Sequence, residues 1–144
     1  MSQENVKIIN RAYELMNALG RIEDDTAVTA LFGATQLFDP EIEMVQMADL
    51  PGTAGTFRGF DGIMQARTEV AAVFSNVQFH PERHVPSGDT VVSVVRVSGT
   101  GRTSGVPVDV RVGHEWVIRE GRIVRWIVHP DPAGALEAVG PRSR

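Results

Sequence analysis

The spacing of apolar residues changes its period about half-way along the chain. Up to about residue 76, apolar side chains recur every three or four residues, as one face of an α-helix requires. After that point, segments rich in Val and Ile alternate with turn residues, as in successive β-strands. Helices first and strands afterwards predict an α+β fold, because a curved sheet must hide one face and amphipathic helices supply the cover.

Three helices are expected in the first half, at residues 2–20, 24–38 and 61–76. The second is expected to include Leu37 and Phe38 and to stop there, because Asp39-Pro40 forbids a further turn.

The remaining segments predict one strand, a long loop and an antiparallel meander. Residues 42–47 form a short mixed segment that suits a strand, and residues 48–59 hold one Pro and three Gly, as in a long surface loop that is a candidate lid. The meander strands and a short terminal helix are expected at 77–80, 90–98, 106–118, 122–129 and 133–139. No internal repeat is visible, so one domain over residues 1–144 is expected.

Composition excludes several classes of function. The net charge is −4 and the fourteen basic residues are scattered, so no surface is expected to neutralise a run of phosphates in nucleic acid. The chain has no cysteine, and His80, His84 and His129 lack the spacing of a zinc site, so we expect neither metal nor cofactor. No apolar run has the length of a membrane span or a signal peptide, which predicts a cytoplasmic protein with no membrane partner.

Five short motifs follow one another along the chain: Arg11-Ala12-Tyr13-Glu14, Phe38-Asp39-Pro40-Glu41-Ile42-Glu43-Met44, Thr56-Phe57-Arg58-Gly59, Gly113-His114-Glu115-Trp116 and Glu120-Gly121-Arg122-Ile123-Val124. In this order they resemble the SnoaL-like branch of the nuclear-transport-factor-2-like superfamily. The resemblance implies a cone with an interior cavity, formed by a bent sheet around a long helix, and a homodimer joined through the outer face of the sheet. It does not imply one activity, because this fold serves isomerases, cyclases, dehydratases, epoxide hydrolases and non-enzymatic adaptors.

His114 is the first candidate catalytic residue. In the segment 110–118 the even positions are the more apolar set, so alternation predicts that His114 faces the interior. The resemblance aligns it with the acidic oxyanion-stabilising position of the ketosteroid isomerases. An imidazole there could act as acid or base, and the alternative is a neutral core histidine bonded to one neighbour.

Glu43 is the second candidate, because the resemblance places residues of the first strand so that they look into the cone. Burial would raise its pKa and suit it to be a general base, whereas a solvated carboxylate is the alternative. Arg96 shares a predicted face with Val92 and Val94, and could pair with Glu43 or bind a ligand carboxylate. An outward-facing arginine is the other interpretation.

Four further residues are candidate ligand contacts. The hydroxyl of Tyr13 could donate to a bound oxygen, although core packing with the hydroxyl at the rim is an alternative. Trp116 and Trp126 suit an apolar pocket wall and equally suit core filling. Val45 stands where the isomerases carry their proton-shuttling aspartate, so this resemblance does not extend to ketosteroid isomerisation.

These residues support two main hypotheses. The first is an enzyme in which Glu43 and His114 transfer protons next to a carbonyl of a small hydrophobic molecule, by cyclisation, isomerisation or dehydration. The second is a non-catalytic ligand-binding protein or dimeric scaffold of the same fold. A third role, as a protein adaptor, would use an apolar sheet exterior made of Val91, Val95 and Val97.

Overall fold

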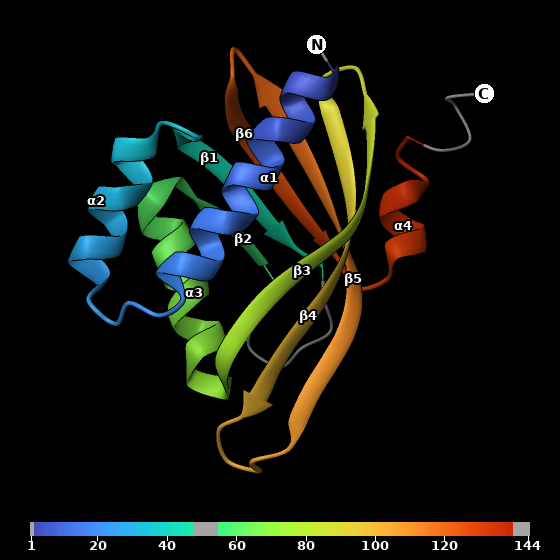
Figure 1. Cartoon of the computed structure of the whole chain (residues 1–144). Coiled ribbons are helices and arrows are strands. Elements are labelled where there is room, and N and C mark those ends of the chain that lie inside the picture. Colours follow the sequence, from blue (N-terminus) through green and yellow to red (C-terminus); the bar gives the residue numbers. More distant parts are fainter. Residues whose placement is uncertain (1, 48–54, 140–144) are drawn as a thin grey trace.

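Four helices flank a single six-stranded sheet in the computed structural model, which describes residues 2–47 and 55–139 (Figure 1). The helices are α1 (Ser2–Leu19), α2 (Asp25–Thr35), α3 (Gly59–Val73) and α4 (Pro132–Leu136). The first three lie against one side of the sheet and α4 against the other. The predicted α+β fold, with N-terminal helices packed on a curved sheet, is therefore confirmed.

The sheet has the order β2-β1-β6-β5-β4-β3. Its strands are β1 (Phe38–Gln46), β2 (Gly55–Arg58), β3 (Phe74–Ser87), β4 (Thr90–Gly101), β5 (Pro107–Arg119) and β6 (Arg122–His129). Strands β3 to β6 form the expected antiparallel meander, and β1 then joins β6 in parallel. This parallel junction brings β1 from the N-terminal half next to β6 near the C-terminal end of the described residues.

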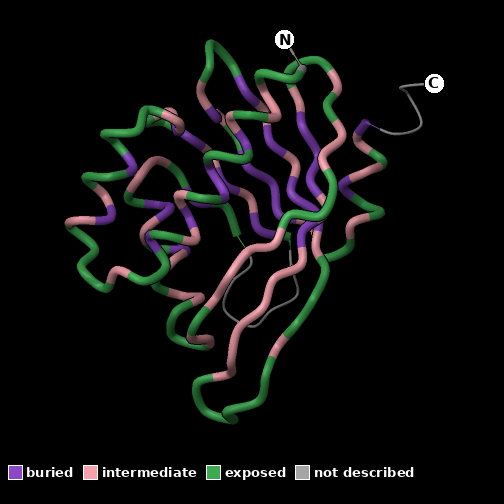
Figure 2. The backbone as a smooth tube through the Cα atoms, in the orientation of Figure 1, coloured by how far each residue is buried: buried purple, intermediate pink, exposed green. Residues whose placement is uncertain are grey.

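The two faces of the sheet differ in their cover. We call the face that carries His114 and Trp116 the inner face; it lies against α1, α2 and α3 and holds the main apolar core. We call the opposite face the outer face; it carries Glu115 and Arg125, and α4 covers part of it. Buried positions gather where the helices cross the sheet, while the far ends of β4 and β5 extend beyond it with intermediate or exposed residues (Figure 2).

Two asparagines of α1 dock this helix on the edge strand β3. Asn17 exchanges two hydrogen bonds with the backbone of Phe79, at 2.9 Å and 2.8 Å. Asn10 bonds His84 of the same strand at 2.9 Å. Asn10, Tyr13 and Asn17 are three and four residues apart, so one stripe of α1 faces the sheet and places Tyr13 over it.

Several predicted boundaries were wrong, and prolines account for most of them. Helix α2 ends at Thr35, where Gln36 takes a left-handed conformation (φ 58°), and Phe38 begins β1 instead of ending the helix. Pro40 is tolerated in β1 because it lies where the pairing with β6 is interrupted, between Phe38 and Glu43. Strand β3 likewise runs through Pro81 and Pro86, because it is an edge strand with one unpaired side.

The last part of the expected loop 48–59 is a strand. Residues 55–58 form strand β2, which pairs with β1. The candidate lid at 48–54 lies outside the described residues.

The faces of β4 are opposite to the prediction. Val91 and Val95 are fully buried in the main core on the inner face, so they do not form an apolar exterior. On the outer face, Val92 is buried by α4 together with Ala135 and Val139. A Cβ at Gly113 would lie 2.5 Å from the Cβ of Ala135, so only glycine leaves room for α4 there.

No helix within the described ranges is long and apolar enough to cross a membrane.

Candidate functional site

A row of mainly polar side chains crosses the inner face beneath α1. Cross-strand pairing aligns Gln46 with Val128, Val128 with His114, His114 with Ser93, and Ser93 with His84. Directly paired residues project to the same side of a sheet about 5 Å apart, so these five side chains form one continuous row. We call this set the polar row: Gln46, Val128, His114, Ser93 and His84.

His114 is the centre of the row and is 2% exposed, as the alternation of β5 predicted. Aromatic rings surround it. Tyr13 stacks on it at a ring-centroid distance of 5.7 Å, and the edges or tilted faces of Phe79, Trp116 and Trp126 lie at 5.9, 5.5 and 5.3 Å. Trp116 and Trp126 are stacked on each other at 4.7 Å. The predicted apolar hollow around His114 is therefore filled by rings in this structure.

The Tyr13 hydroxyl is the hydrogen-bond partner of His114. Its Oη lies 2.7 Å from His114 Nδ1 and accepts a hydrogen bond from Trp116 Nε1 at 3.2 Å. The hydroxyl is thus buried beside His114, and the expectation that it would lie at the rim was wrong. The reason is the position of Tyr13 on the docking stripe of α1, which directs it onto the centre of β5.

Burial sets the protonation of this pair. Removal from water, with a smaller contribution from the charge of His129, lowers the pKa of His114 to about 3. Burial also raises the pKa of Tyr13, and hydrogen bonding with Ser93 and Trp116 partly opposes this. Both groups are therefore neutral over the physiological pH range. If His114 accepts a proton, it must pass a proton on to another group, because its buried ring does not hold the positive charge.

Trp126 carries a buried polar group without a partner. The residue is 5% exposed, and its Nε1 has no hydrogen-bond partner among the described residues. Since the ring of Trp126 contacts the rings of both Trp116 and His114, this donor belongs to the surroundings of His114. An unpaired buried N–H costs roughly 1–3 kcal/mol, so its presence needs an explanation.

The structure does not bring Glu43 and His114 together. Glu43 pairs with Arg125 in the sheet, whereas its neighbour Met44 pairs with Trp126, so Glu43 lies on the outer face. Its two carboxylate oxygens bind Arg58 and Arg125, each at 3.0 Å. The predicted orientation was wrong because the segment 42–47 alternates weakly, and the more apolar Ile42 and Met44 take the core side.

Val45 shares the outer face with Glu43. Both line a surface hollow of about 600 Å³, together with Arg58 and Arg125 and with residues at the start of α3. A second hollow, of about 230 Å³, lies between Phe38 and Phe60. Neither hollow is lined by a member of the polar row.

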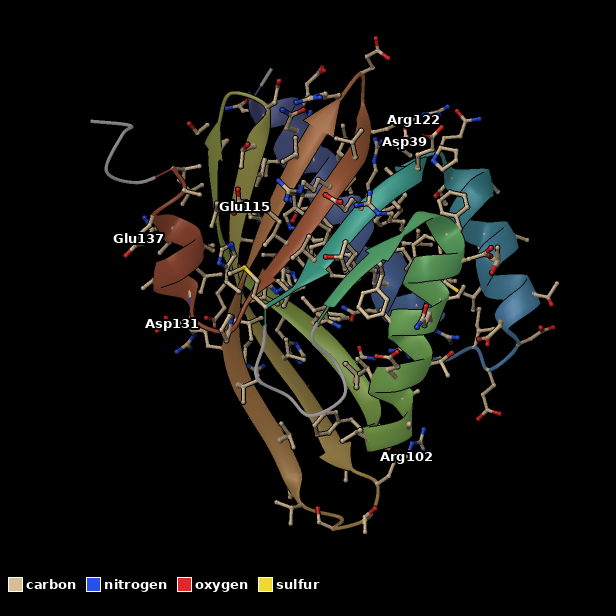
Figure 3. All side chains as sticks on the ribbon, turned by 180° about the vertical axis from the view of Figure 1, so that it is seen from behind. Asp39, Arg102, Glu115, Arg122, Asp131 and Glu137 are labelled. Atoms are coloured by element: carbon tan, nitrogen blue, oxygen red, sulfur yellow. The ribbon has the colours of Figure 1, made fainter. Side chains whose placement is uncertain are left out.

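Arg96 also lies on the outer face, where it forms a 3.0 Å ion pair with Asp109. It lies on the face opposite to His114, since β4 has the opposite phase to the one predicted, and its ion-pair partner is Asp109, whereas Glu43 pairs with Arg58 and Arg125. Farther along the same face, His129 Nε2 lies 3.0 Å from Glu115 Oε1. Figure 3 shows the sheet from this side, with Glu115 near α4 and its flanking residues Asp131 and Glu137. Within residues 2–47 and 55–139, no three His, Asp or Glu side chains form a group that could hold a metal ion.

Two members of the site escaped the sequence analysis. Ser93 is fully buried, and its Oγ lies 2.8 Å from His84 Nδ1. His84 was considered only as a metal ligand, and its pKa is lowered by partial burial. The signal that would have found both is the phase of β4, because a buried Val91 places Ser93 on the inner face as well.

The sequence profile of the SnoaL-like domain matches residues 21–126, which is most of the described sheet together with α2 and α3. The chain belongs to the SnoaL-like domain family. No curated protein matches this SnoaL-like chain. The match does not include α1, and therefore leaves out Tyr13 and Asn10.

Solved structures share the fold of this SnoaL-like protein at low sequence identity. A nuclear-transport-factor-2-like protein from Burkholderia pseudomallei K96243 has a TM-score of 0.70 and 19% identity, over 97% of this chain and 99% of that one. TerC, co-crystallised with polyporic acid, has a TM-score of 0.70 and 22% identity, over 93% and 96%. A putative SnoaL-like polyketide cyclase from Jannaschia sp. CCS1 has a TM-score of 0.71 and 14% identity, over 98% of this chain and 94% of that one.

Proposed function

We propose that this protein binds a small, neutral, mostly apolar molecule on the inner face of its sheet, and that His114 moves a proton at that molecule. The observation that carries the proposal is the buried Nε1–H of Trp126, which has no partner among the described residues and belongs to a ring in contact with His114. A ligand oxygen that accepts this hydrogen bond would remove the cost of the unpaired donor. It would also place the atoms next to that oxygen near the imidazole.

The charge distribution favours a neutral ligand. The polar row contains an amide, a hydroxyl and two imidazoles, and the ion pairs of Glu43 and Arg96 lie on the outer face. A charged ligand would lose its hydration without gaining an opposite charge. A ketone offers the acceptor that Trp126 lacks and remains neutral.

The ring packing favours a small ligand. Because aromatic rings surround His114, a ligand must turn at least one of them aside, and the cost of this movement rises with ligand size. Proteins of the same fold provide a precedent for small organic molecules. TerC was crystallised with polyporic acid, and a ketosteroid-isomerase-like protein from Catenulispora acidiphila DSM 44928 is in complex with trimethylamine.

A pair of probes tests the binding step. Cyclohexanone is a small neutral ketone, and methylenecyclohexane has nearly the same shape without the oxygen. Both tryptophans of the chain lie in the site, so their fluorescence reports directly on it. We expect cyclohexanone to change this fluorescence saturably, and Trp126→Phe to weaken its binding about tenfold, which corresponds to about 1.4 kcal/mol. Methylenecyclohexane should bind the wild type and Trp126→Phe equally; saturation by neither probe would refute the proposal.

Exchange of the protons next to the carbonyl tests the chemical step. In D₂O, we expect the protein to accelerate deuterium incorporation at the α-carbons of cyclohexanone, as followed by NMR. His114→Asn keeps a hydrogen-bonding partner for the Tyr13 hydroxyl but cannot carry a proton, so it should abolish the acceleration. Glu43→Gln on the outer face is the matched control and should leave it unchanged.

A second candidate function is binding without catalysis. It is favoured by the position of Glu43, whose ion pairs on the outer face leave His114 without the carboxylate partner that the sequence suggested. Saturable binding of cyclohexanone without any accelerated deuterium exchange would select this function over the first.

A further inference from the structure

A series of hydrogen-bonding groups connects His114 with the protein surface. Tyr13 Oη lies 2.7 Å from His114 Nδ1, Ser93 Oγ lies 2.8 Å from His84 Nδ1, and His84 Nε2 lies 2.9 Å from Asn10 Oδ1. Ser93 is paired directly with His114 across β4 and β5, and its side chain interacts with the Tyr13 hydroxyl, which joins the two parts of the series. Asn10 is exposed and His84 is half-buried, while Ser93 and His114 are fully enclosed. The series therefore runs from the core to solvent.

The direction of the hydrogens along this series follows from its outer end. Asn10 presents its carbonyl oxygen to His84 Nε2, so Nε2 carries the hydrogen and Nδ1 of the neutral ring accepts one from Ser93. Ser93 Oγ is then free to accept from the Tyr13 hydroxyl. Tyr13 Oη in turn accepts from Trp116 Nε1 and from His114 Nδ1. Every donor is used once, and His114 Nε2 is left with a free lone pair.

His114 alone would be a poor proton acceptor in this position. Burial strongly disfavours its positively charged form, and the surrounding rings provide no counter-charge. His84 is better placed to hold the charge because it is only partly buried. The groups packed against His84 from α1 are the ring of Tyr13, stacked at 6.1 Å, and the amide of Asn10, and both are uncharged.

We propose that His84 is the solvent-side end of a proton path from His114, and that it also selects the tautomer in which His114 Nε2 is the acceptor. The choice of the His114 tautomer does not depend on a ligand. Only the entry of a proton from a ligand into the path rests on the function proposed above. Neither Ser93 nor His84 contacts the ligand in this proposal, so both are positioning residues.

Each transfer along the path moves one proton by one place. A proton taken up at His114 Nε2 makes the ring a cation, which passes its Nδ1 hydrogen to Tyr13 Oη. Tyr13 passes its own hydrogen to Ser93, and Ser93 passes its hydrogen to His84 Nδ1. His84 is then the cation, and it releases its Nε2 hydrogen to water. One proton enters and one leaves, and His114 ends neutral with the hydrogen on Nε2.

The tautomer of His114 tests the path without any ligand. Nitrogen-15 NMR distinguishes a protonated Nδ1 from a protonated Nε2, and the chain contains only four histidines to assign. We expect Nδ1–H in the wild type. In His84→Phe and in Ser93→Ala the Tyr13 hydrogen loses its route outward and turns to His114, so Nε2–H should become the main form. Ser93→Ala removes a single oxygen and is the variant that retains the fold if His84→Phe does not.

A conservative variant separates orientation from proton transport. His84→Gln can still accept a hydrogen bond from Ser93 through its amide oxygen, but an amide does not carry a proton at neutral pH. We expect His84→Gln to retain Nδ1–H on His114 and yet to slow exchange of that hydrogen with water about tenfold. His80 also bonds a serine, Ser98, at 2.9 Å, but its neighbour in the β4 pairing is the outer-face residue Arg96. His80→Gln is therefore the matched control and should change neither the tautomer nor the exchange rate.

Two results would overturn the proposal. One is a wild-type His114 that already carries its hydrogen on Nε2. The other is an exchange rate of the His114 Nδ1 hydrogen in His84→Gln equal to that of the wild type. Both measurements are made on the free protein, so they stand whether or not cyclohexanone binds.

Discussion

The inner and outer faces of strands β4 and β5 carry polar groups in two different states. On the inner face, Ser93 and His114 are a directly paired couple, fully buried and neutral. Three residues away along the same strands, Arg96 and Arg111 are directly paired on the outer face and bind the carboxylates of Asp109 and Glu82. The same two strands thus present a neutral hydrogen-bonded row on one side and solvated ion pairs on the other.

This difference teaches which polar groups matter for stability. Buried groups cannot replace a lost partner with water, so each missing hydrogen bond in the polar row costs the full desolvation of the group left behind. The charged groups of an exposed ion pair are well hydrated when they are apart, so the pair contributes little to the free energy of unfolding. Substitutions on the inner face should therefore lower the free energy of unfolding much more than substitutions on the outer face, and the following experiments compare the two.

The largest effect is expected at Trp116. This residue is fully buried, and it contacts Tyr13, His114 and Trp126 at once. Trp116→Ala should lower the free energy of unfolding by about 3–5 kcal/mol, because it removes a large buried side chain and leaves a cavity. Urea denaturation followed by circular dichroism measures this change. A loss below 1 kcal/mol would mean that the inner face is not the core of the fold.

Acid should destabilise the protein through His114. The unfolded chain protonates this residue below its ordinary pKa of 6.5, whereas burial lowers the folded-state pKa to about 3. The unfolded state therefore binds more protons in this window, and stability should fall by up to about 1.4 kcal/mol per pH unit as pH decreases from 6.5 towards 3. The lowered pKa of His84 acts in the same direction.

Substitution of His114 isolates its share of this acid effect. His114→Asn should flatten the dependence, when urea denaturation is compared at pH 7, 6, 5 and 4. His80→Asn on the outer face is the control and should retain the wild-type slope. An unchanged slope in His114→Asn would show that His114 is accessible to protons in the folded state.

A smaller loss is expected from removal of one oxygen on the inner face. Tyr13→Phe leaves both His114 Nδ1 and Trp116 Nε1 without their partner. The free energy of unfolding should decrease by about 1–3 kcal/mol, with little change in apolar packing. Thermal unfolding of the two single variants Tyr13→Phe and His114→Phe and of the double variant provides the check. If both residues belong to one network, the loss of stability in the double variant should differ from the sum of the two single losses.

The smallest effect is expected on the outer face. Arg96→Ala breaks the ion pair with Asp109, in which both side chains are more than one-third exposed. The change in the free energy of unfolding should stay within about 0.5 kcal/mol. Its measurement beside Tyr13→Phe in the same buffer gives the contrast between the faces directly. A loss equal to that of Tyr13→Phe would remove the distinction drawn here.

The sequence predicted the elements better than their faces. Strand β6 and the start of β4 were predicted to the residue, and His114 was correctly assigned to the interior because the even positions of β5 are clearly the more apolar ones. In β4 both alternating sets consist largely of valine, so alternation could not choose between them. The consequence was an outward placement of Val91 and Val95 and the omission of Ser93.

The site required information that periodicity does not contain. Glu43 was expected to meet His114, but the parallel pairing of β1 with β6 directs it towards Arg125 on the outer face. Tyr13 and His114 are separated by 101 positions in sequence, and it is the docking of α1 on β3 through Asn17 that brings them together. Local patterns specify which side of a strand is apolar, but not which distant residue will face it.

By itself, the sequence determined the order of the helices and strands other than β2, the α+β class and the burial of His114, because these depend on spacing within one segment. The tertiary structure decided the rest: the neutral polar row, the unpaired Nε1–H of Trp126 and the separation of Glu43 from His114. These features depend on strand register and on the docking of α1. Both are set by the packing of the whole core and leave no local trace in the chain.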